Sequence, residues 1–84
     1  MKIMYLLFSF TVGGTERLVA DICNQMDAQN EEVHLYIIND LIDDNLLNTL
    51  NKNIHVKLLK RKVGSKDKFS PLFEVAKYIK ENRI

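Results

Sequence analysis

Two adjacent glycines, Gly13 and Gly14, follow an apolar run and precede a segment of helical periodicity that starts at Thr15. A glycine-rich turn from a strand into a helix can bind phosphate, because glycine lets the anion approach the backbone and the helix dipole adds positive potential. The same pair can also form a tight turn that holds no ligand. The residues around the pair indicate which of these two interpretations applies.

The established phosphate motifs do not occur around this pair. No lysine follows Gly14 at the place where a P-loop has one, and the spacing G-x-G-x-x-G is missing. Asp40 lies where a dinucleotide fold has its ribose-binding acid, but without the glycine motif it is better explained as a turn or helix-start aspartate. We therefore do not expect a nicotinamide cofactor.

The histidines and the cysteine stand apart from one another in the sequence. Neither His34 nor His55 has a serine or carboxylate at a spacing typical of a nucleophilic set, so both are expected to be structural or on the surface. Cys23 is the only cysteine, which excludes an intrachain disulfide and a cysteine metal cluster. Its place among apolar residues predicts a small buried side chain, and no metal site is expected.

The charge balance is nearly neutral. With 12 basic and 11 acidic residues the net charge is +1, which provides no electrostatic reason to expect a nucleic acid partner. Basic residues do gather late in the chain, where a solvated loop is the simplest explanation. This loop contains Arg61, Lys62, Lys66 and Lys68.

Length and composition indicate one globular unit. The chain has 84 residues, of which 46% are hydrophobic and 27% charged. The opening residues 1–10 are apolar, but they lack a small-residue cleavage site and are shorter than a membrane span of about 18 residues. Together with the single cysteine, this makes a cytoplasmic setting the simplest expectation.

The hydrophobic pattern predicts three strands that alternate with three helices. The strands are expected at residues 3–10, 31–40 and 53–60, and the helices from Thr15, from Asp43 or Asp44, and from Ser70 as an N-cap before Pro71. Leu18 and Leu72 are expected on the inner faces of the first and last helices, and Phe8 in the core.

The order β-α-β-α-β-α predicts an α/β fold that forms half of a doubly wound, Rossmann-like parallel sheet, with helices on both faces. Strand order 3-2-1 is expected, with the first strand the most buried and the third at an edge. Residues 3–10 would then carry a long apolar edge that invites pairing with another chain. We expect a fragment of a longer protein, or an oligomer that self-associates through this strand.

The stretch KIMYLLFSFTVGGTERLVADICNQM resembles the amino-terminal strand, G-G-x-E-R loop and first helix of family 4 retaining glycosyltransferases, which have the GT-B fold of two facing Rossmann-like domains. The resemblance extends over nearly the whole chain. It implies that residues 1–84 are a partial amino-terminal domain, which lacks the fourth strand onward and the carboxy-terminal domain.

The same resemblance implies a site for part of a sugar-transfer reaction. Gly13, Gly14, Thr15 and Glu16 would lie near the donor phosphates or the acceptor, although Glu16 and the neighbouring Arg17 are equally well explained as first-turn helix residues. The nucleotide-sugar is a substrate, so no cofactor is implied, and the catalytic residues are not identified. The acceptor would be a saccharide or a lipid-linked molecule.

The basic loop would lie on the acceptor side, facing a phosphate-bearing lipid or the inner membrane surface. Without its second domain, the chain alone is not expected to transfer sugar. Two alternatives remain open. One is a small α/β module that binds a partner through its first strand, and the other is a nucleotide-binding half-domain of another enzyme class.

Overall fold

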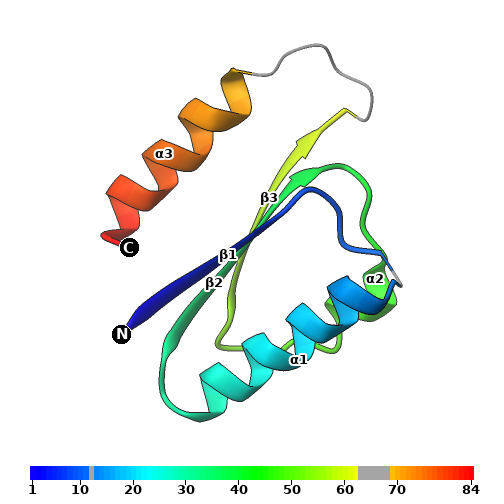
Figure 1. Cartoon of the computed structure of the whole chain (residues 1–84). Helices are drawn as coiled ribbons and strands as arrows, with labels where there is room; N and C mark the ends of the chain where they lie inside the picture. Colours follow the sequence, from blue (N-terminus) through cyan, green and yellow to red (C-terminus); the bar gives the residue numbers. More distant parts are fainter. Residues whose placement is uncertain (12, 63–68) are drawn as a thin grey trace.

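A computed structural model describes residues 1–11, 13–62 and 69–84 of the chain. Strands and helices alternate along the sequence, as expected (Figure 1). The elements are β1 (Lys2–Leu7), α1 (Gly14–Ala28), β2 (Glu32–Asn39), α2 (Asp44–Leu47), β3 (His55–Arg61) and α3 (Ser70–Asn82).

The three strands form one parallel sheet in the order β1-β2-β3. The α/β class with a parallel sheet is confirmed, and the strand neighbours are consistent with the expected order. The expectation that the first strand is the most buried is wrong. Strand β2 has six successive buried residues, whereas β1 is only half-buried, because β1 pairs on one side alone among the described strands.

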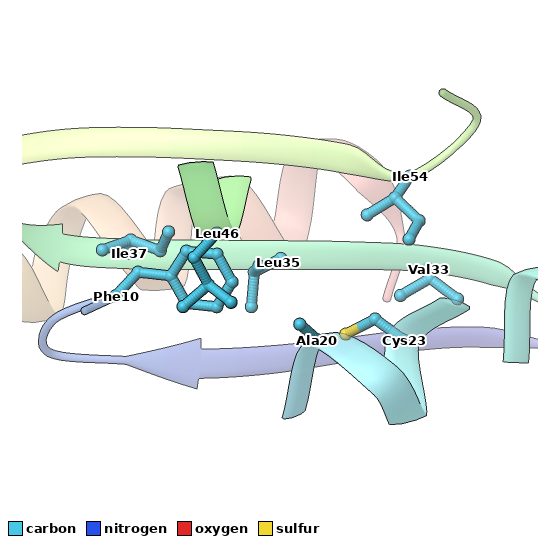
Figure 2. Close-up of a cluster of buried hydrophobic side chains, with 8 residues drawn as sticks. All are labelled: Phe10, Ala20, Cys23, Val33, Leu35, Ile37, Leu46 and Ile54. Carbon is cyan, nitrogen blue, oxygen red and sulfur yellow. The ribbon is translucent and has the colours of Figure 1, made fainter. Parts of the chain in front are cut away.

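Alternate side chains of β2 enter two separate hydrophobic clusters, as the period of a strand requires. Val33, Leu35 and Ile37 pack against α1 and α2 on one face of the sheet (Figure 2). Tyr36 and Ile38 pack against α3 on the other face. Helices therefore cover both faces of the sheet (Figure 1).

The buried thiol of Cys23 lies in the cluster between α1 and the sheet (Figure 2). Its burial is confirmed, and desolvation raises the pKa of Cys23 to about 11. The thiol is therefore protonated at neutral pH and acts as a small hydrophobic side chain.

Three expected core positions are exposed. Leu18 is 58% exposed because it lies five residues from the buried Cys23, about 140° around the helix axis at 3.6 residues per turn. Phe8 (65%) and Leu72 (66%) are exposed because they line an open pocket instead of closing the core.

Helix α3 also begins differently from the expectation. Its first helical residue is Ser70, its N-cap is Phe69, and Pro71 is in the first turn, where its missing amide costs nothing. None of the described helices is long and apolar enough to cross a membrane.

Tyr36 is fully buried, and within the described part of the chain its hydroxyl has no hydrogen-bond partner. Removing this hydroxyl should not weaken the fold, because a buried polar group without a partner carries a desolvation cost of about 1–3 kcal/mol. Tyr36→Phe is expected to keep or raise the free energy of unfolding measured by urea denaturation. A loss above about 1 kcal/mol would show that the hydroxyl has a partner.

Candidate functional site

The glycine pair forms the start of α1, at the carboxyl-end side of β1. Gly13 is the N-cap, and its extended backbone (φ −122°, ψ 169°) is one that any residue can adopt. Its amide donates to Thr11 O at 2.7 Å, and the first helical bond runs from Arg17 N to Gly13 O at 3.2 Å. Helix geometry leaves the amides of the first turn, including Gly14 and Thr15, without an intrahelical acceptor.

The two glycines differ in their surroundings. A Cβ atom on Gly13 would collide with the carboxylate of Glu16, which folds back over this residue. A Cβ atom on Gly14 would meet no atom within 4 Å. Gly13 therefore makes room for Glu16, whereas neither backbone nor neighbouring atoms require a glycine at position 14.

Glu16 is half-buried at the third position of the helix, while Gly14 and Thr15 are exposed. A carboxylate in the first turn interacts favourably with the positive end of the helix dipole. This position accounts for Glu16 as a helix-stabilising residue. It also places a negative charge beside the amides that a phosphate would use.

A pocket of about 440 Å³, lined mostly by polar residues, lies beside α1 from Arg17 to Asn24, between this helix and α2. Asp43 caps α2, since its Oδ1 accepts from Asn45 N at 2.8 Å and from Leu46 N at 3.2 Å. Asn24 of α1 donates from Nδ2 to Thr49 O at 2.9 Å, which connects α1 to the segment that follows α2. The pocket is lined by Arg17, Asp21, Asn24, Asn45, Leu46 and Thr49.

The basic residues lie elsewhere. Arg61 ends β3, after a register shift and a left-handed Lys60 (φ 57°), and its Nε donates to Asn39 Oδ1 at 2.8 Å. Its side chain also lines an apolar pocket of about 450 Å³ on the face that α3 covers, opposite to α1. Arg61 is thus a structural residue, separate from the glycine loop. Lys62 is exposed, while Lys66 and Lys68 lie outside the described residues.

A polar cluster that the sequence did not predict surrounds His34 of β2. The side chain is buried, with 2% exposure, and both ring nitrogens have partners. Nδ1 lies 2.6 Å from the Tyr78 hydroxyl of α3, and Nε2 lies 2.7 Å from Glu32 Oε2. A neutral imidazole satisfies both contacts if Nε2–H donates to Glu32 and the Tyr78 hydroxyl donates to Nδ1.

His55 joins the same cluster from β3. Its ring stacks on that of His34, with 4.6 Å between centroids and 17° between planes. The two histidines are register partners on adjacent strands, although 21 positions separate them in sequence. The sequence holds a signal for one part of the cluster, because Glu32 lies two residues before His34 and therefore on the same strand face. The contact of His34 with His55 depends on the register of the two strands.

The cluster changes the acidity of its members. The hydrogen bond from His34 is the main cause that lowers the pKa of Glu32 below its ordinary value of 4.5, with Lys2 adding to the effect. Burial raises the pKa of Tyr78, and the charge of Glu32 raises it further. At neutral pH the cluster therefore contains a carboxylate and a protonated phenol on either side of the imidazole.

Comparison of the chain with known proteins finds no matching family model, no matching curated protein and no matching solved structure.

The lowered pKa of Glu32 predicts a pH-dependent stability. The ionised carboxylate is favoured in the folded state, so its contribution is present above the ordinary pKa of 4.5 and is lost as the pH falls through the lower folded value. Glu32→Gln keeps the shape but removes the charge. Urea denaturation should show wild type more stable than this variant at neutral pH, with the difference shrinking at acidic pH.

Glu74→Gln, which removes an exposed carboxylate of α3, serves as the control and should not reproduce this pattern. A difference between wild type and Glu32→Gln that stays constant between neutral pH and pH values below 4.5 would contradict the assignment.

Proposed function

We propose that this chain is the amino-terminal, acceptor-side part of a glycosyltransferase that moves a sugar from a nucleotide-sugar to a saccharide or lipid-linked acceptor. In this proposal the sheet is one half of a doubly wound, Rossmann-like sheet of order 3-2-1. The observation that carries it is Gly14, which stands at the start of a helix after a parallel strand without any requirement from the fold. A ligand that approaches the backbone closely would explain why residue 14 is a glycine.

The roles within the loop follow from charge. The exposed amides at Gly14 and Thr15 suit a donor phosphate, because they lie at the positive end of the α1 dipole. The carboxylate of Glu16 repels phosphate but accepts hydrogen bonds from sugar hydroxyls, so we assign it to the acceptor. The polar pocket that includes Arg17 adjoins this loop and offers room for a sugar ring.

This site has one wall, and we propose that a second domain supplies the other. Exposed apolar residues also surround the open pocket on the opposite face of the sheet, and they support further structure packed against that face. They are Leu6, Phe8 and Leu72. The site of action in this proposal is the cytoplasm, with the basic residues after β3 near the inner membrane surface.

The coding sequence downstream of Ile84 tests this proposal directly. We expect it to encode a fourth parallel strand and then a second Rossmann-like domain. A stop codon directly after Ile84 would contradict the proposal. Nucleotide-sugars added to the 84-residue chain alone should bind weakly or not at all, and micromolar binding by calorimetry would favour a complete nucleotide site of another enzyme class.

Gly14→Ala separates a role in the fold from a role in ligand binding. Because a Cβ atom fits there and alanine favours helix, the free energy of unfolding should stay unchanged or rise by up to about 1 kcal/mol. In the enzyme that contains this chain, we expect a fall of about tenfold or more in kcat/KM for the nucleotide-sugar.

Gln25→Ala, on the exposed side of the same helix, is the matched control for Gly14→Ala and should leave both measurements unchanged. Full activity of Gly14→Ala would contradict the assigned role of the loop.

One observation favours a second candidate function, a module that binds a partner through β1. Among the described strands, β1 pairs only with β2, so its other edge has unpaired backbone groups. Leu6, which belongs to β1, has an exposed side chain. Such an edge pairs readily with another strand. We propose that the 84-residue chain self-associates through this edge when nothing else covers it.

Size-exclusion chromatography with light scattering tests this self-association. Wild type should show a mass that rises with concentration, and Leu6→Lys should lower it, since a lysine on an edge strand opposes pairing. Leu18→Lys is the matched control, because Leu18 is also an exposed leucine but belongs to α1. A monomeric wild type at every concentration, or equal effects of the two variants, would contradict the role of the β1 edge.

A further inference from the structure

We propose that Glu32, His34 and His55 form a binding site for a divalent transition metal ion of the zinc type. Each side chain offers one ligand atom, and these atoms all lie within 4.8 Å of one another. Two imidazoles and one carboxylate are a donor set that zinc uses, with the fourth tetrahedral position left to water. This site is independent of the proposed function.

The backbone brings the three ligands together. Glu32 and His34 are two residues apart on β2, so their side chains emerge on the same face. His55 is the register partner of His34 on the adjacent parallel strand. All three residues lie toward the amino ends of their strands, whereas the glycine loop follows the carboxyl end of β1. The sheet therefore separates the two sites.

The ligand atoms are close to the spacing that a metal needs. Metal bonds of about 2.0–2.2 Å in a tetrahedron place two ligand atoms roughly 3.4 Å apart. His34 Nε2 and Glu32 Oε2 are now 2.7 Å apart, as a hydrogen-bonded pair. The metal would take the place of the proton on Nε2, which moves to Nδ1 of the same neutral imidazole. The exposed side chains of Glu32 and His55 can open outward while the buried His34 stays in place.

Tyr78 gives the site its outer support. Its hydroxyl lies 2.6 Å from His34 Nδ1, so it can accept from Nδ1–H when Nε2 binds the metal. Metal-binding histidines generally have such a partner on their second nitrogen, because it holds the tautomer and the ring orientation. The same contact that orders His34 in the fold therefore also presents Nε2 to a metal.

One charge opposes a cation at this place. Lys2 Nζ lies 3.8 Å from Glu32 Oε2, although it also donates to Asn82 O at 2.7 Å. The proximity of this ammonium group leads us to expect moderate affinity, with a dissociation constant on the order of micromolar. Because protons compete with the metal for the ligand atoms, binding should weaken in acid.

The experiment is calorimetric titration of the folded 84-residue chain with zinc chloride at neutral pH, with cobalt absorption spectra as a second readout. We expect one ion per chain and a cobalt spectrum without the thiolate charge-transfer band, since Cys23 is buried and outside the site. His55→Gln should weaken zinc binding by about tenfold or more, because it removes a ligand.

Two control variants locate the site. Glu31→Gln removes the adjacent carboxylate, which pairs with the amino terminus at 3.0 Å, and should leave zinc affinity within about twofold. Cys23→Ser should do the same. His55 is exposed, so its substitution removes one ligand and a ring contact but keeps the contacts of His34 with Glu32 and Tyr78.

The titration can overturn the proposal in three ways. The proposal is overturned if the wild-type chain binds no zinc at zinc concentrations up to about 1 mM. Undiminished binding by His55→Gln would exclude the assigned ligands, and binding that depends on Cys23 would show that zinc captures a partly unfolded chain.

Discussion

The double-sided burial of β2 is the constraint on which the rest of the structure depends. Its apolar side chains alternate between the two faces of the sheet, so helices must pack on both faces to remove them from water. Strands β1 and β3 both pair with it in parallel, and parallel neighbours need crossover segments between them. The helices that connect the strands are these crossover segments, which explains why strands and helices alternate along the chain.

Burial also explains why β2 carries a polar group with directional contacts. Burying His34 between β2 and α3 costs free energy unless both ring nitrogens have hydrogen-bond partners. Glu32 and Tyr78 are these partners. Because Tyr78 belongs to α3, this contact connects the last helix to the sheet. Only two residues of α3, Pro71 and Val75, are buried, so its hydrophobic interface with the sheet is small. The hydrogen bond from Tyr78 adds a directional contact to this interface.

The two ends of the sheet have different chemistry. At the carboxyl end of β1, the chain turns into α1 with exposed amides, a free approach to Gly14 and a polar pocket nearby. At the amino ends of β2 and β3, side chains supply imidazole and carboxylate groups. Backbone amides suit anions and side-chain nitrogen and oxygen atoms suit metal ions, so the two proposed sites need not compete.

The amino-acid sequence by itself determined the order of elements, the parallel α/β class and the place of the glycine loop. These depend on local signals: apolar runs of strand length, helical periodicity and turn residues that act over a few neighbours. The buried thiol of Cys23 and the cap at Asp43 were predictable for the same reason.

Only the tertiary structure decided which strand is central, which apolar residues are exposed and which polar residues meet. Leu18 and Leu72 have the hydrophobicity of core residues, but helix rotation and an open pocket expose them. His34 and His55 are distant in the sequence, and the register of two parallel strands brings their rings into contact. Register is set by the packing of whole elements, so no local pattern around either histidine could have indicated the other.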